Sequence, residues 1–141
     1  MQITLVPVEG IDVVWKRIED YVQGTAEYTH GRYTKGDIRT GLMTKPQHLW
    51  LAHEGEEVFG FVVTEIANYP QLKALVMHFT GGRELDSWKP QMLEMLQSFS
   101  KLHGCDVIES FGRAGWAKVF KKDGFKSMYN FYELPVEGNT Q

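Results

Sequence analysis

The chain has 141 residues, with 15 Lys and Arg against 18 Asp and Glu and a formal net charge of −3 at pH 7. This length fits one domain, which we expect over residues 1–135, followed by a polar tail at 136–141. The single cysteine excludes an intrachain disulfide, and the mildly acidic balance argues against nucleic acid as a partner. No apolar stretch reaches the ~18 residues of a membrane span, so we expect a soluble, cytoplasmic protein without a membrane partner.

The first third of the chain predicts one strand and two helices. Residues 3–8 alternate imperfectly between apolar and polar side chains, and a proline among them favours a position near a sheet edge. From Ile11 the apolar residues recur at helical spacing, and Gly24 is the expected end of that helix. The polar segment 25–36 predicts a loop, and a short helix is expected over 37–45.

The middle of the chain predicts three consecutive strands. Two β-rich runs, 48–52 and 58–64, flank a glycine-containing turn and are typical of a hairpin. Residues 72–79 form a further strand with apolar side chains on both faces, which predicts a central place in the sheet. Gly81 and Gly82 are expected to end this strand.

The last third predicts a long helix over 87–103 and a short strand over 106–110. A fourth helix, closed by Gly124, precedes a closing strand or strand pair over 125–134. The resulting order, β-αα-βββ-α-β-α-β(β), is that of a mixed α/β domain.

This order resembles that of the GCN5-related N-acetyltransferase (GNAT) superfamily. The motifs that carry the resemblance are Asp-Gly-Phe at 123–125 and the strand–Gly-Gly–helix junction at 75–90. The resemblance implies a mixed, mostly antiparallel sheet flanked by four helices. It also implies acyl transfer from acetyl-CoA to an amine, with the cofactor held where two central strands separate. The chain is similar, too, to short acetyltransferase-like proteins of tailed bacteriophages, in the segments 50–66 and 104–109.

The resemblance implies that the cofactor pairs with the strand ending at Phe79 and that its diphosphate lies where the long helix begins. The implied cofactor-binding residues are Met77, His78, Phe79, Gly81, Gly82 and Arg83. However, Glu84 and Asp86 place carboxylates at this point, and Asp86 or Ser87 is expected to cap the helix and occupy N–H groups that phosphates would need. The alternative to a cofactor site here is an ordinary capped helix.

The resemblance also implies a general acid and a general base. The family's tyrosine acid corresponds to Phe120, which has no hydroxyl and fits a buried helix face. The base candidates are Glu65 and His78. Glu65 comes first because it interrupts an apolar strand, where an unpaired carboxylate is costly. The alternatives are a solvent-facing glutamate and a hydrogen-bonded core histidine.

Tyr28, His30 and Tyr33 lie in the segment that, by the resemblance, shapes specificity for the acceptor, although helix packing accounts for them equally well. No Cys or His pattern has the spacing of a metal site, so no metal is expected.

Two hypotheses follow. In the first, the chain is an acetyl-CoA-dependent N-acyltransferase that acts on the amine of a small molecule or a protein. Glu65, or a water that it holds, is then the base, and backbone N–H groups near residues 77–79 stabilise the developing oxyanion. In the second, it is a non-catalytic protein with the same fold, such as a bacteriophage virion or assembly component with other structural proteins as its partners.

Overall fold

The computed structural model describes residues 1–111 and 121–138. The chain divides into two units, residues 1–111 and 112–141, and each is described by itself. The candidate site lies in the first unit. None of the helices in the described residues is long and apolar enough to cross a membrane.

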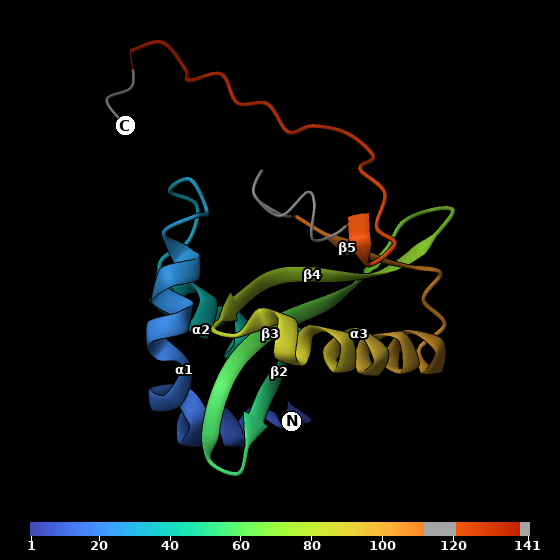
Figure 1. The fold of residues 1–141 in the computed structure, drawn as a ribbon. Coiled ribbons are helices and arrows are strands. Elements are labelled where there is room, and N and C mark those ends of the chain that lie inside the picture. The colour runs from blue at the N-terminus through green and yellow to red at the C-terminus, as the bar shows by residue number, and fades with distance from the viewer. Residues whose placement is uncertain (112–120, 139–141) are drawn as a thin grey trace. The chain divides into compact units, whose positions relative to one another are not determined.

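The first unit has the element order predicted up to the fifth strand. Its elements are β1 (Gln2–Val6), the 3-10 helix η1 (Val8–Gly10), α1 (Ile11–Ala26), α2 (Lys35–Thr44), β2 (Gln47–Glu54), β3 (Glu57–Asn68), β4 (Lys73–Gly82), α3 (Leu85–Leu102) and β5 (Val107–Ser110). The strands form one sheet in the order β1-β2-β3-β4-β5. Strands β2, β3 and β4 of this sheet are labelled in Figure 1. The strand pairs are antiparallel except β4 and β5, which are parallel. The edge position of β1 and the central position of β4 are therefore confirmed.

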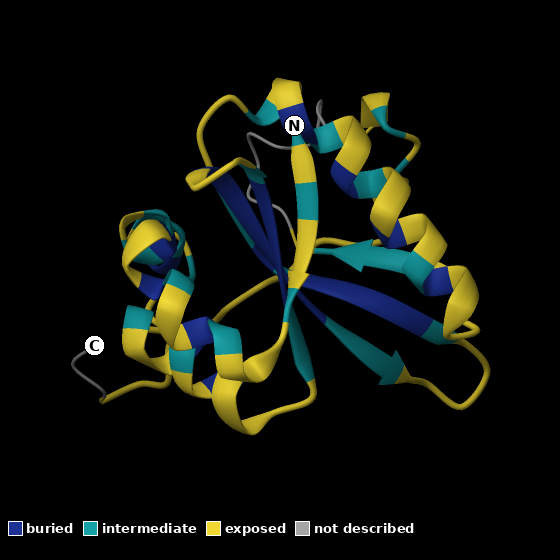
Figure 2. Ribbon diagram, turned by 90° about the horizontal axis from the view of Figure 1, so that it is seen from below, coloured by how far each residue is buried: buried dark blue, intermediate teal, exposed yellow. Residues whose placement is uncertain are grey.

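Helices cover both faces of this sheet (Figure 2), and the central strands β3 and β4 are buried over residues 58–64 and 74–77. On one face, α1 and α2 bury a regularly spaced apolar side against the strands, as an amphipathic helix does. The core of this face includes Ile18, Val22, Leu42, Phe61 and Val63. On the other face lies α3, which buries Trp88, Met92 and Leu96.

Each of the two central strands contains a β-bulge. Between β2 and β3 the partners shift after His53↔Val58 to Ala52↔Gly60, so Phe59 is an extra residue in β3. Between β3 and β4 the partners shift from Val63↔Phe79 to Thr64↔Met77, so His78 is an extra residue in β4. A bulge redirects side chains locally because two residues of one strand then oppose one of its partner.

Three glycines expected to end elements lie within them instead. Helix α1 continues past Gly24 to Ala26, because Ala26 adds to the buried side of the helix and its packing outweighs a glycine cost of about 1 kcal/mol. Strand β4 includes Gly81 and Gly82 and stays paired with β3. A Cβ at Gly81 would lie 2.3 Å from Thr25 Oγ1, and one at Gly82 would lie 2.3 Å from the carbonyl oxygen of Phe59. The glycines therefore permit close packing of the strand rather than end it.

The sequence predicts a fourth helix and a closing strand after β5. The core of the predicted fourth helix, with Phe120, lies outside the described residues. The predicted closing strand over 125–134 is wrong, because that segment has no regular secondary structure. Its apolar residues come in adjacent pairs, such as Met128 and Tyr129, which give no single buried face. A strand also needs a hydrogen-bonded partner, which the local sequence does not specify.

Gly60 offers a direct test of how α3 packs on the sheet. A Cβ at Gly60 would lie 2.3 Å from the ring carbon Cζ2 of Trp88, whose side chain is buried. We expect Gly60→Ala to lower the free energy of unfolding by about 1–3 kcal/mol in chemical denaturation, because the rigid indole has to move. Gly24→Ala is the control, since nothing lies within 4 Å of its Cβ, and it should stabilise the protein by up to about 1 kcal/mol. Equal stability of the two variants would contradict this packing.

Candidate functional site

His78 and Glu65, which the sequence offered as alternatives, form one hydrogen-bonded pair. His78 Nε2 lies 3.0 Å from Glu65 Oε1. Val63 and Glu65 share a face of β3, and their partners in β4 are Phe79 and Val76. The extra residue, His78, lies between Phe79 and Met77, so the bulge turns its side chain to the face that Phe79 and Glu65 occupy. The pair is therefore a product of the irregularity in β4.

A third side chain joins this pair from β2. Gln47 is opposite Glu65 in the sheet, and its Nε2 donates a hydrogen bond to the same Oε1 at 3.1 Å. The side chains of His78 and Glu65 are 28% and 27% exposed, which leaves them accessible to a ligand. Sequence reasoning missed Gln47.

The pair lies where β4 loses its partner on one side. Strand β5 pairs with β4 from Ala74 to Met77, and the last pair is Met77↔Ser110. Strand β4 continues to Gly82. In the part of the chain that the structure describes, β5 therefore leaves the β4 edge beyond Met77 unpaired. Strand β5 ends at Ser110, and His78 is the first residue of β4 beyond its pairing with β5.

The loop between α1 and α2 contributes one of its predicted residues to this region. The ring of Tyr33 packs edge-on against Phe79 with centroids 5.0 Å apart. Tyr28 is exposed in the same loop, and the carbonyl of His30 accepts a hydrogen bond from Arg32. Tyr33 is therefore a predicted acceptor residue that the structure brings next to β4.

The predicted cofactor residues of β4 differ in what they can offer. Met77 and Phe79 are only 5% and 8% exposed, so little of either residue is accessible to a ligand. Gly81 and Gly82 are required by packing against Thr25 and Phe59, which accounts for both glycines without a ligand.

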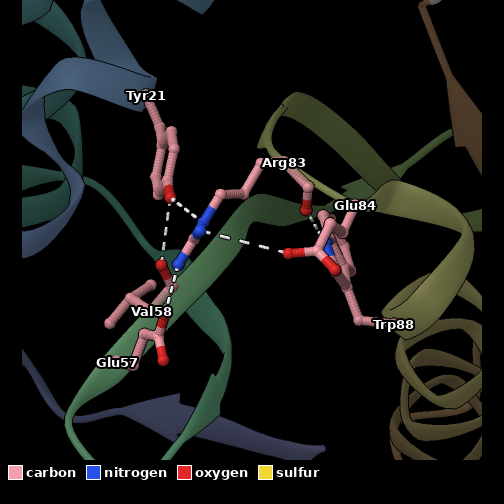
Figure 3. A network of polar contacts seen from close by, with 6 residues as sticks. All are labelled: Tyr21, Glu57, Val58, Arg83, Glu84 and Trp88. Atoms are coloured by element: carbon pink, nitrogen blue, oxygen red, sulfur yellow. Dashed lines mark hydrogen bonds and ion pairs between the residues drawn. The ribbon is translucent and has the colours of Figure 1, made fainter.

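The side chain of Arg83 is engaged within the protein (Figure 3). Its Nη2 donates to Glu57 Oε1 at 2.6 Å, and its Nε donates to the hydroxyl of Tyr21 at 3.1 Å. The guanidinium carbon lies 4.5 Å from the ring centre of Phe59, and Glu84 Oε2 is 4.0 Å from Nη1. The hydrogen bond to Glu57 is the main cause that raises the pKa of Arg83. A ligand phosphate would have to compete with Glu57 for this cation.

The start of α3 differs from the prediction. Neither Asp86 nor Ser87 caps the helix; the capping position is Glu84, which has a left-handed backbone with φ 52° and makes no side-chain capping bond. The indole Nε1 of Trp88 donates to the carbonyl of Arg83 at 2.9 Å, and this bond ties the short connection after β4 to the helix. The capping residue therefore leaves the first backbone N–H groups of α3 without a side-chain hydrogen bond. Glu84 and Asp86 still place carboxylates near these N–H groups.

A second polar cluster lies on the opposite face of the sheet, beneath α3. The hydroxyl of the buried Thr64 accepts from Trp50 Nε1 at 2.9 Å and lies 2.9 Å from His48 Nδ1. The His48 ring packs against Phe99 with centroids 4.9 Å apart. Burial is the main cause that lowers the pKa of His48 below 6.5, and the charge of His103 adds to it.

The lowered pKa of His48 predicts a loss of stability in acid. As pH falls below 6.5 the unfolded chain binds the proton before the folded chain does, so the free energy of unfolding decreases until His48 is protonated in both states. We expect His48→Gln to reduce this decrease, measured by urea unfolding at pH 5 and pH 7.5. His53→Gln, at the other end of β2, is the control. A decrease of the same size in His48→Gln as in the parent protein would contradict the assignment.

In the described residues, no group of three or more His, Cys, Asp or Glu side chains is arranged to hold a metal ion. Phe120, the position of the implied family acid, lies outside these residues. The site as described is therefore an acid–base pair beside an unpaired strand edge.

Comparison with known proteins identifies the fold. The sequence matches no protein-family model and no curated protein sequence. Among solved structures, a probable acetyltransferase matches with a TM-score of 0.71 and 16% identity, over 99% of this chain and 100% of that one. The chain has an acetyltransferase fold. Two further GNAT-like structures agree with this result. Ribosomal-protein-alanine N-acetyltransferase from Brucella melitensis biovar Abortus 2308 has a TM-score of 0.72 and 12% identity, over 96% of this chain and 100% of that one. An aminoglycoside acetyltransferase from an uncultured soil metagenomic sample has a TM-score of 0.69 and 13% identity, over 96% and 98%. The GNAT-like fold class predicted from the order of elements is confirmed.

Proposed function

We propose that the chain is an N-acyltransferase that moves an acyl group, in the simplest case acetyl, from a coenzyme A thioester to an amine. The observation that carries the proposal is the His78–Glu65 pair, which lies where β4 loses its partner β5 in a GNAT-like fold. A partly buried acid–base pair on two neighbouring strands has no evident structural purpose, because two apolar residues would pack there at lower cost.

The chemistry needs a proton acceptor at this position. An amine is largely protonated in neutral water and attacks a thioester only after it loses that proton, so a positioned base accelerates the reaction. In this proposal the His78–Glu65 pair takes the proton. Backbone N–H groups near residues 77–79 oppose the negative charge that develops on the carbonyl oxygen.

The residues of β4 and the start of α3 suit the thioester arm of acetyl-CoA better than they suit its diphosphate. The thioester, when bound, supplies an activated acyl group, and the edge of β4 beyond its pairing with β5 offers backbone groups for the amides of its arm. At the diphosphate end, Arg83 is already paired with Glu57, and Glu84 and Asp86 repel an anion. We therefore expect acetyl-CoA to bind through its thioester arm, with a weak contribution from its diphosphate.

Calorimetric titration with acetyl-CoA, followed by an assay of thiol release with a panel of small amines and amine-bearing peptides, tests the proposal. Saturable heat in the micromolar range together with amine-dependent thiol release supports an acyltransferase. No heat at millimolar acetyl-CoA and no thiol release would contradict it.

A second candidate is a non-catalytic protein that keeps the fold as an interaction module. The observation that favours it is the Arg83–Glu57 pair, which satisfies the cation without any ligand. The bacteriophage assembly role that the sequence suggested belongs to this candidate, with other structural proteins as partners. The same titration separates the candidates, because an interaction module has no need to bind acetyl-CoA.

A further inference from the structure

A buried glycine in α2 makes room for the amide of Gln47. A Cβ at Gly41 would lie 2.8 Å from Gln47 Oε1. Glycine inside a helix costs about 1 kcal/mol relative to alanine, so its presence here needs a local reason. The other glycine of this helix, Gly36, differs, since its Cβ would meet only Thr34 Oγ1 at an ordinary 3.7 Å. Helix α2 and strand β2 thus hold the Gln47 side chain between Gly41 and Glu65.

The hydrogen bonds of Glu65 define the protonation of His78. Glu65 Oε1 lies 3.1 Å from Gln47 Nε2 and 3.0 Å from His78 Nε2. An ionised carboxylate only accepts hydrogen bonds, so both nitrogens are donors. His78 therefore carries a proton on Nε2, and the nitrogen of the neutral ring that can accept a further proton is Nδ1.

We propose that Gln47, seated against Gly41, is a positioning residue that fixes Glu65 and through it the tautomer of His78, with Nδ1 as the proton acceptor. A carboxylate held by a single donor can rotate and present either oxygen, whereas a second donor from a neighbouring strand fixes it. The arrangement follows the general scheme in which a base is oriented by a third group. Its meaning for catalysis rests on the proposed function, but the tautomer itself is a property of the free protein.

Nuclear magnetic resonance of the imidazole nitrogens tests the proposal directly. The spectra are recorded at a pH where the His78 ring is neutral, and its signals are assigned by their loss in His78→Gln. We expect the parent protein to carry the proton on Nε2. In Gln47→Ala the ratio of the two tautomers should shift toward Nδ1–H by roughly threefold to tenfold, the ratio that one net hydrogen bond supports.

Gly41→Ala tests whether α2 takes part. The atom that its Cβ would displace is the far end of a flexible side chain, so the variant should fold while the Gln47 amide moves. We expect the tautomer ratio to shift in the same direction as in Gln47→Ala, and Gly36→Ala, the matched control in the same helix, to leave it unchanged. If Gly41 acts only through Gln47, Gly41→Ala has no further effect in a Gln47→Ala background.

An unchanged tautomer in Gln47→Ala would overturn the proposal, as would a parent protein with its proton on Nδ1. If the tautomer responds but no amine is acylated, the proposed function fails and the positioning role stands. If transfer is found, Gln47→Ala should lower kcat with little change in KM for the acyl donor. Active transfer with an unchanged tautomer would leave the proposed function intact and refute the role of Gln47.

Discussion

His78→Gln is expected to lower the rate of acyl transfer by about 10²–10⁴-fold, the usual contribution of a positioned general base. Glutamine keeps a polar side chain of similar reach but cannot accept a proton at neutral pH. Glu65→Gln removes the negative charge beside His78 Nε2, so it should also lower the rate, since the imidazolium that forms when His78 takes the proton is then less stabilised. The measurement is kcat from thiol release at saturating amine, with calorimetry to show that affinity for acetyl-CoA changes little.

The control for this prediction is His53→Gln. His53 lies on β2 at the end remote from the pair, where its ring nitrogens contact Thr4 Oγ1 and the carbonyl oxygen of Gly55. Loss of a histidine there should leave kcat unchanged. If His78→Gln retains the full rate while the protein remains folded, the pair is not the base.

Glu57→Gln is expected to tighten the binding of acetyl-CoA by roughly tenfold, the scale of one charge interaction near a protein surface. The carboxylate of Glu57 lies 2.6 Å from Arg83 Nη2 and occupies the cation that an incoming diphosphate would use. Adding Glu84→Gln, which removes the acid at the start of α3, should strengthen binding further. Calorimetric titration of both variants measures the effect.

Two variants make this prediction specific. Glu56→Gln removes the same charge from the neighbouring turn, where Glu56 pairs with Arg17 at 3.5 Å, and should leave the affinity nearly unchanged. Adding Arg83→Gln to Glu57→Gln should abolish the gain, because the freed cation is then absent. Equal gains in affinity for acetyl-CoA in Glu56→Gln and Glu57→Gln would show that the effect comes from net charge alone and would contradict the role of Glu57.

The fold could be predicted largely because local periodicity and burial agree over the first unit. The spacing of apolar residues from Ile11 specifies an amphipathic helix, and the two-sided apolar run ending at Phe79 specifies a central strand. The predicted ends of elements were wrong where contacts between residues distant in the sequence determine the structure. Gly81 and Gly82 looked like a strand end, but their missing side chains are what allow β4 to lie against α1 and β3.

The site could be predicted only as separate residues. Glu65 and His78 were each identified by their chemistry, but their pairing depends on the bulge at His78, which periodicity does not signal. Gln47 was missed for a related reason. An unbroken hairpin with Glu54 opposite Glu57 would place Gln47 opposite Thr64, and the bulge at Phe59 shifts it to Glu65. A shift of one residue changes the face on which a side chain lies.

The measurement that bears most directly on the proposed site is a titration of isotope-labelled protein with acetyl-CoA, followed by the backbone amides of β4 and the ring nitrogens of His78. We predict saturable shifts at residues 78–82 and at the His78 imidazole, with little change on β1 at the far edge of the sheet. Saturable shifts confined to other surfaces, or no shift at millimolar acetyl-CoA, would contradict the assignment of a thioester site beside the His78–Glu65 pair.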